Sequence, residues 1–138
     1  MSRIINPDSS SKNRARLART VVLAVRRLAN QTEPGTESRD IAAYIALALD
    51  GIAKTIDSTV GPWEKRGYWV KADRFRMEWV WTETCSKKMR RSVLDGDWNS
   101  IAEAAAMTAS KLSKTTISDG NRLGEPWKGA WQILSDQG

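Results

Sequence analysis

The chain contains no histidine and only one cysteine, and this excludes several common kinds of protein site. Histidine is the commonest general base near neutral pH, and with cysteine it supplies most zinc ligands. A histidine-based catalytic triad, a histidine-containing zinc site and a di-iron site built on Glu-x-x-His therefore all lack a required residue. Cys85 alone can form neither an internal disulfide nor a multi-thiolate cluster. A mechanism based on carboxylate, lysine or tyrosine side chains stays open.

No hydrophobic run in the chain is long enough to cross a membrane. The longest, residues 41–49, is about half of the roughly 20 apolar residues that a membrane-spanning helix requires. The N-terminal residues lack the apolar segment of a signal peptide. The nine glycines are scattered, and they form neither a phosphate-binding loop nor a dinucleotide-binding motif. We therefore expect a cytoplasmic protein with no membrane span, no cofactor and no metal.

The hydrophobic content and the charge of the chain are typical of a folded domain. Of the 138 residues, 41% are hydrophobic and 28% are charged, which is too apolar for general disorder. The length predicts a single helical domain, residues 1–138, with one core and with about residues 1–10 as a flexible arm. A formal net charge of +6 favours an anionic partner, such as nucleic acid, an acidic protein or an anionic membrane surface.

Apolar residues recur at three- and four-residue spacing along most of the chain, a pattern that predicts helices and no strands. The expected helices cover residues 9–31, 37–59, 62–94 and 98–112, and a short one starts at Pro126. The sequence therefore predicts an all-α fold, a four-helix-type bundle with an additional short C-terminal helix and a central tryptophan-rich third helix. We expect the short helix to lie across the bundle as a lid.

Glycine and proline mark the expected breaks between the helices. Pro34 and Gly35 separate the first two, and the pair Gly61-Pro62 is expected to end the second and begin the third. The segment Asp95-Gly96-Asp97 indicates a helix end followed by a new N-cap.

The same aspartates also match part of a calcium-binding loop. Asp95, Asp97 and Asn99 fall at its first, third and fifth positions. However, Ser100 stands where the loop needs glycine, and Ala106 stands where it needs a bidentate glutamate. We therefore favour helix capping over calcium binding for this segment.

The stretch GPWEKRGYWVKADRFRMEWVWTE, residues 61–83, holds four of the seven tryptophans. If it forms one helix, its large side chains fall on two sides. One side has Trp63, Val70, Met77, Trp81 and Cys85, and the other has Tyr68, Ala72, Phe75 and Trp79. This pattern predicts either a central helix packed by its neighbours on both sides, or one that packs on its own bundle with one side and on a partner with the other.

A polar pair is expected within these aromatic residues. Arg74 falls on the side of Trp63 and Trp81, where it needs an acidic partner, and Glu78 lies one turn later. Stacking of the guanidinium on an indole would add stabilisation. The predicted interface or ligand-binding residues are Tyr68, Trp69, Arg74, Phe75, Glu78 and Trp79.

Two groups of basic residues form a predicted basic patch. Lys12, Arg16, Arg19, Arg26 and Arg27 lie opposite the apolar face of the first helix, which has no acidic residue from Ser9 to Thr32. Lys87, Lys88, Arg90 and Arg91 lie near the end of the third helix. Such cations can contact phosphates. The alternatives are a solvated face for the first group and favourable interaction with the helix C-terminus for the second.

Three functions fit these patterns, and none has a catalytic motif. The favoured one is a non-catalytic interaction module that binds itself or another protein through an aromatic and arginine surface. The first alternative is a nucleic-acid-binding protein that uses the basic first helix and stacks bases on an exposed indole such as Trp69. The second alternative is a pocket for a small anionic ligand, or an unrecognised enzyme site, between the helices.

Overall fold

The computed structural model describes residues 7–137, and every regular element in that range is an α-helix. The helices are α1 (Pro7–Ala29), α2 (Thr36–Lys65), α3 (Trp69–Asp95), α4 (Trp98–Lys111) and α5 (Ala130–Gln137). This confirms the predicted all-α bundle with a short C-terminal helix. Within the described range, no helix is both long enough and apolar enough to span a lipid bilayer.

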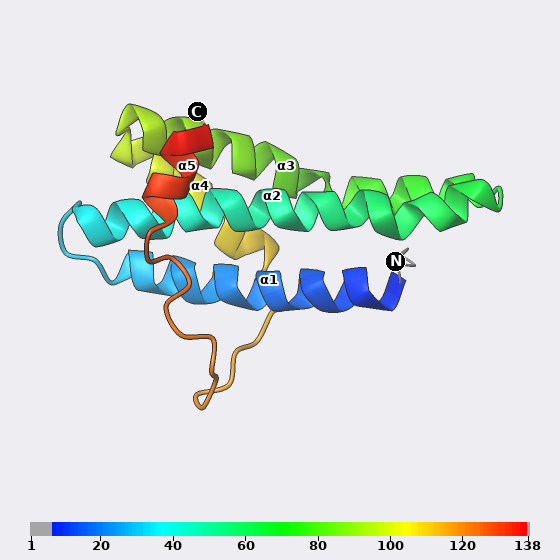
Figure 1. Cartoon of the computed structure of the whole chain (residues 1–138), viewed down its shortest axis with the longest axis horizontal. Coiled ribbons are helices and arrows are strands. Elements are labelled where there is room, and N and C mark those ends of the chain that lie inside the picture. The colour runs from blue at the N-terminus through cyan, green and yellow to red at the C-terminus, as the bar shows by residue number, and fades with distance from the viewer. Residues whose placement is uncertain (1–6, 138) are drawn as a thin grey trace.

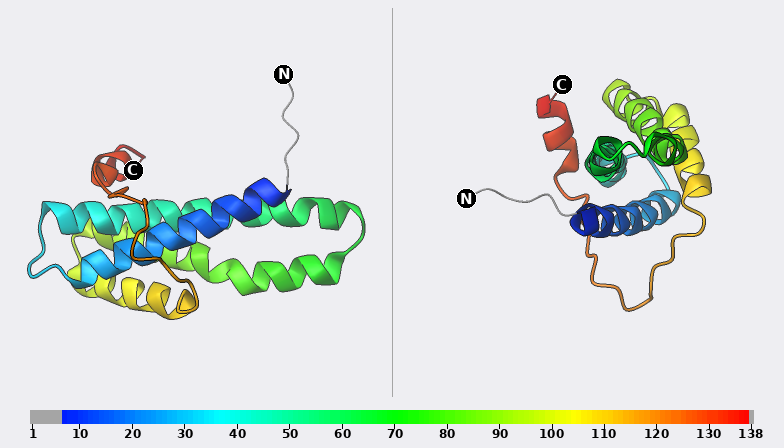
Figure 2. Two further views of the ribbon diagram at one scale, coloured as in Figure 1. Left: turned by 90° about the horizontal axis from the view of Figure 1, so that it is seen from below. Right: turned by 90° about the vertical axis from the view of Figure 1, so that its right-hand side faces the viewer.

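The two longest helices, α2 and α3, form an antiparallel hairpin that runs the length of the molecule (Figure 1). α1 packs along α2, and α4 packs against α3 and touches α1 (Figure 2). α5 contacts α2 on the outside of this four-helix arrangement. The turn between α2 and α3 projects beyond the beginning of α1 (Figure 1).

The core is built mainly on α2. Ile41, Ile45, Leu49 and Ile52 recur at three- and four-residue spacing and are fully buried, as expected for the apolar face of an amphipathic helix. Small residues between them let the neighbouring helices approach closely. At Gly51, an added Cβ would lie only 3.2 Å from Cδ1 of a leucine on α1.

The end of α2 differs from the prediction. The helix continues through Gly61 and Pro62 to Lys65, so Trp63 belongs to α2 and not to α3. Pro62 is tolerated because it removes a single helical hydrogen bond in the last turns of the helix. The helix ends instead at Lys65, just before the left-handed Gly67.

Gly67 ends α2 because its φ of 82° is a left-handed conformation, which glycine adopts without steric cost. The amide of Gly67 donates to the carbonyl of Glu64 (3.0 Å), and the amide of Tyr68 donates to the carbonyl of Trp63 (2.9 Å). This pair of hydrogen bonds is the Schellman motif of helix C-termini. α3 therefore begins at Trp69.

The segment between α3 and α4 has the predicted capping arrangement. Gly96 is left-handed, with a φ of 68°, and closes a second pair of C-terminal hydrogen bonds. Asp97 then accepts a hydrogen bond from the amide of Ser100 (3.2 Å) and one from its hydroxyl (2.8 Å). These hydrogen bonds lower the pKa of Asp97. Capping thus accounts for the aspartate that also suggested a calcium loop.

The two ends of the chain also differ from the predicted boundaries. α5 begins at Ala130 and not at Pro126, because left-handed Gly129 (φ 80°) interrupts the segment before it. The carboxylate of Asp40 on α2 accepts hydrogen bonds from the amides of Gly129 (3.4 Å) and Trp131 (2.9 Å) and so caps α5. Of the predicted flexible arm, residues 1–6 lie outside the described residues, and 7–10 already belong to α1.

Candidate functional site

In the first half of α3, only one of the two predicted apolar sides faces the rest of the bundle. Further along the helix, Trp81 and Cys85 of the other side also pack on the core. The inward positions recur at alternating spacings of three and four, as in helices that pack with a small crossing angle. They are Ala72, Phe75, Trp79, Thr82, Ser86, Met89 and Val93, all buried or half-buried. The hydroxyl of Ser86 donates to the backbone carbonyl of Ala46 on α2 (2.7 Å).

Phe75 and Trp79, which we predicted at an interface, therefore pack inside the hairpin. The ring of Phe75 meets that of Trp63 edge-on, with centroids 5.4 Å apart. Both rings, with Trp79, cover the buried side chains of Ile56 and Val60. The sequence prediction differs because Trp63 lies on α2, opposite Phe75, and not on the same helix.

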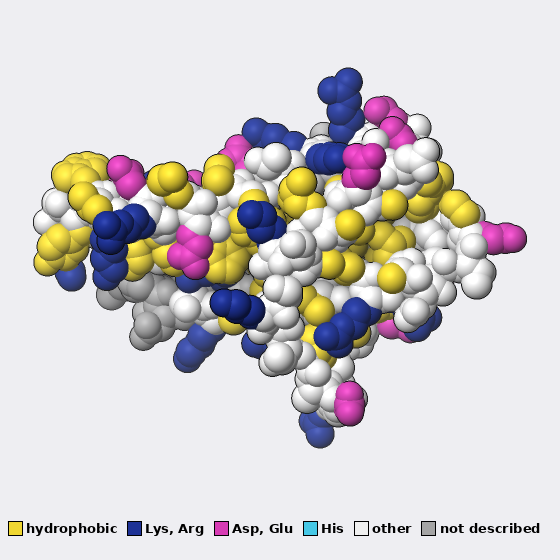
Figure 3. All heavy atoms as spheres, turned by 180° about the vertical axis from the view of Figure 1, so that it is seen from behind, with side chains coloured by type: hydrophobic (Ala, Val, Ile, Leu, Met, Phe, Trp, Pro, Cys, Tyr) yellow, Lys and Arg dark blue, Asp and Glu magenta, His cyan; other side chains and the backbone are white. Residues whose placement is uncertain are grey.

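The opposite side of the first half of α3 is exposed and mostly apolar, with Asp73 among its large apolar side chains. Trp69, Val70, Met77 and Val80, which we call the outer strip, have exposed fractions of 60%, 65%, 76% and 57%. They fall within a sector of about 100° around the helix axis, facing away from α2. Tyr68, which is 53% exposed, adjoins the strip at the turn. At the end of the molecule that holds the α2–α3 turn, on the left of Figure 3, hydrophobic side chains lie beside lysine and arginine side chains.

The predicted pair of Arg74 and Glu78 does not form. Both side chains are exposed, and no ion pair joins them in residues 7–137. Arg14 of α1 instead occupies the polar position among the aromatic rings, and only 8% of it is exposed. Its guanidinium carbon lies 4.9 Å from the ring centroid of Phe75 and 5.6 Å from that of Trp79.

Arg14 is held by neutral partners. Its Nη1 donates to the hydroxyls of Thr55 (3.2 Å) and Thr59 (3.1 Å) on α2. Burial lowers the pKa of Arg14, and the charge of Glu78 partly opposes this effect. The sequence contained a signal for this position, because Arg14 falls on the same face of the first helix as Leu17 and Val21.

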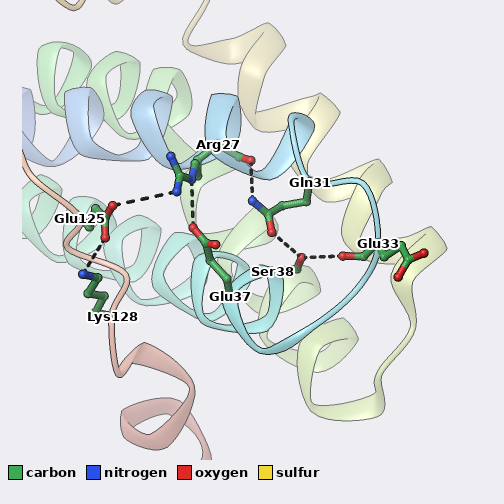
Figure 4. Close-up of polar contacts among 7 residues, drawn as sticks. All are labelled: Arg27, Gln31, Glu33, Glu37, Ser38, Glu125 and Lys128. Carbon is green, nitrogen blue, oxygen red and sulfur yellow. Dashed lines mark hydrogen bonds and ion pairs between the residues drawn. The ribbon is translucent and has the colours of Figure 1, made fainter.

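Five of the nine residues of the predicted basic patch are engaged by internal partners. On α3, Lys87 pairs with Glu83, Lys88 with Glu103 and Arg91 with Asp95, while Arg90 donates to Gln137. On α1, Nε of Arg27 pairs with Glu37 at 2.9 Å and its Nη2 lies 4.0 Å from Glu125 (Figure 4). These contacts favour the structural interpretation of the α3 cations and of Arg27.

The other four cations of the patch have no such partners. Lys12, Arg16, Arg19 and Arg26 are exposed on α1, and none forms an ion pair with the side chains of residues 9–137, which are the side chains that the structure describes. Their one polar side-chain contact among those residues is a hydrogen bond from Arg16 to Asn13 (2.9 Å). We call these four residues the cationic face of α1.

A groove of about 200 Å³ lies between α2 and α3 and is lined by Arg76, but the guanidinium of Arg76 is already bound to acidic side chains. Arg76 in this groove donates to Asp57 and to Glu64 (3.1 Å), and the hydrogen bond with Asp57 is the main reason why the pKa of Arg76 is raised. Arg76 is therefore not free to bind an anionic ligand. Within residues 7–137, no three His, Cys, Asp or Glu side chains gather to hold a metal ion.

Comparison of the chain with protein-family models, with curated proteins and with solved structures found no match.

Proposed function

We propose that the protein is a non-catalytic interaction module that associates with a second copy of itself through the outer strip of α3. The observation that carries the proposal is the exposure of four large apolar side chains on one sector of α3: Trp69, Val70, Met77 and Val80. Large exposed apolar patches on a folded protein typically mark binding surfaces. Tryptophan, tyrosine, methionine and arginine are also the residues enriched in protein interfaces.

Charge on one edge of the strip supports a second copy as the occupant. Arg74 and Glu78 follow one another by one turn, and both are exposed without a mutual ion pair. In a two-fold contact the two copies of α3 run in opposite directions. Arg74 of one copy can therefore lie opposite Glu78 of the other copy. Each Arg74 then faces an acidic side chain of the other copy, and the apolar side chains of the two strips pack around Asp73.

Light scattering after size-exclusion chromatography, over a wide range of protein concentrations, tests the proposal. The unchanged protein is expected to approach twice the mass of one chain. Met77→Glu is expected to raise the dissociation constant by about tenfold or more, because the two-fold contact buries two unpaired carboxylates.

Met107→Glu is the matched control, because Met107 is a 45% exposed methionine on α4, away from the strip. It is expected to leave the mass unchanged. If the unchanged protein stays at the mass of one chain throughout, the proposal is wrong. The same holds if the two variants dissociate equally.

A further inference from the structure

We infer that the cationic face of α1, formed by Lys12, Arg16, Arg19 and Arg26, binds the phosphate backbone of duplex nucleic acid without reading its sequence. This surface is distinct from the outer strip of α3. These cations lack ionic partners among the described side chains, and no large exposed hydrophobic side chain on α1 lies beside them.

The like charges of the cationic face repel one another and destabilise α1. Lys12 and Arg16 are four residues apart, and Arg16 and Arg19 are three apart, so both pairs are neighbours on the helix surface. Like charges at these spacings cost about 0.2–0.5 kcal/mol per pair. The only acidic residue of α1 is Asp8, one turn before Lys12, and no acidic residue follows it as far as Thr32. The α3 cations, in contrast, are matched with nearby polar partners. A polyanion would remove the repulsion on α1.

The length of the cationic face matches a run of several phosphates on a duplex. With a rise of 1.5 Å per residue, the distance from Lys12 to Arg26 along α1 is about 21 Å. One strand of duplex DNA carries about six phosphates over this length. α1 is held along α2 by buried Ala18, Val21 and Ala24, so the cations project from a rigid support. Several of them can therefore displace condensed counterions together.

A neighbouring segment extends the same surface. Ser113 and Thr115, from the segment that follows α4, line a groove together with Arg26. Lys114, which lies between them in the chain, is exposed and adds a cation beside the C-terminal half of α1. Figure 1 shows this segment passing α1 on its way to α5.

The surroundings favour nucleic acid over an anionic membrane. A helix that lies in a membrane surface buries an apolar face in the lipid. The apolar face of α1 is already used against α2, and none of the large exposed hydrophobic side chains among the described residues belongs to α1. The cationic face thus offers charge without a group that inserts into lipid.

The test is fluorescence anisotropy of a labelled mixed-sequence DNA duplex titrated with the full chain at several salt concentrations. Four phosphate contacts predict that affinity falls roughly 150-fold between about 50 and 200 mM salt, because the slope of log K against log salt is about −0.9 per contact. The variant with Lys12, Arg16, Arg19 and Arg26 all changed to glutamine is expected to lose most of the affinity and of the slope.

The control variant has Lys54, Lys87, Arg91 and Lys128 changed to glutamine. These cations form exposed ion pairs elsewhere, and such pairs contribute little to stability. Both variants lower the formal net charge from +6 to +2, since each removes four positive charges. The control is expected to retain most of the binding and of the slope, and circular dichroism checks that both variants are folded.

Three results would overturn the inference. The first is no duplex binding by the unchanged protein at low salt. The second is an equal loss of binding in the two variants, which would indicate a response to net charge alone. The third is tighter binding to vesicles of phosphatidylcholine and phosphatidylserine than to the duplex, with the same dependence on the cationic face.

Discussion

Arg14 of α1 lies with its guanidinium carbon 4.9 Å from the centre of the Phe75 ring of α3, while its Nη1 is hydrogen-bonded to two threonines of α2. One side chain thus joins three helices. A cation over an aromatic face stabilises by roughly 0.5–2 kcal/mol, more when desolvated. The aliphatic part of the arginine also fills space between the helices.

Replacing Arg14 is expected to cost stability in a way that depends on volume more than on charge. Arg14→Ala is expected to lower the free energy of unfolding by about 2–4 kcal/mol, because it leaves a cavity and two threonine hydroxyls without a donor. Arg14→Met is expected to cost less, because it keeps much of the volume and removes the need to desolvate a charge.

Urea unfolding followed by tryptophan fluorescence measures both effects. Arg16→Ala is the control, because Arg16 is exposed on the same helix and is expected to change stability by less than about 0.5 kcal/mol. An Arg14→Ala variant as stable as the Arg16→Ala variant would contradict the role of Arg14 as a link between the helices.

Two glycines near the end of α2 are expected to respond differently to alanine. Gly67→Ala is expected to destabilise by about 1–2 kcal/mol, because its φ of 82° is strained for any residue with a Cβ. Gly61→Ala is expected to change stability by less than about 0.5 kcal/mol, because the gain in helix propensity is opposed by the restriction that Pro62 places on a preceding residue with a Cβ.

Thermal unfolding of the two variants measures this difference. It also tests where α2 ends. If Gly61 were the end of the helix and Gly67 an interior residue of the next, Gly61→Ala would be the more destabilising of the two changes.

Cys85 is expected to be unreactive in the folded protein. The thiol is buried, and burial is the main cause of its raised pKa. A thiol-specific alkylating reagent at mildly alkaline pH should therefore label it only after unfolding. Rapid labelling of the native protein would show that α3 and α4 separate readily at this position.

The raised pKa of Cys85 also predicts a pH dependence of stability. Above about pH 8.5, the thiol ionises in the unfolded chain but stays protonated in the folded one, so the folded state binds more protons. The free energy of unfolding should then fall as the pH rises. Cys85→Ala should remove this contribution, so the difference between the two unfolding curves across the alkaline range isolates it.

Local signals in the sequence were sufficient for the fold class and for several helix ends. The spacing of Ile41, Ile45, Leu49 and Ile52 predicts a core helix, and the residues are buried as expected. Asp95-Gly96-Asp97 predicts a C-cap and an N-cap, because both depend on residues only a few positions apart.

The candidate site was less predictable, because it depends on contacts between distant residues. Gly61-Pro62 is a local break signal, but α2 continues because the last turns of the helix tolerate a proline and because Trp63 packs on Phe75. Because α2 continues past Gly61-Pro62, Trp63 belongs to α2 and not to α3. This changes which side of α3 is left exposed. Likewise, Arg14 meets Thr55 and Thr59 across more than forty residues of chain, and no spacing within one helix reveals such a contact.

The cap on α5 has a consequence for the order in which the chain assembles during its synthesis. Asp40 finds its hydrogen-bond donors 89 and 91 residues later in the chain. The hairpin of α2 and α3, and the contact of α1 with α2, use residues that leave the ribosome much earlier. Since α1, α2 and α3 can pack on one another without α5, we expect Asp40 to lie in a folded helix before α5 docks on it. We therefore expect α5 to dock last, where the carboxylate of Asp40 caps its N-terminus.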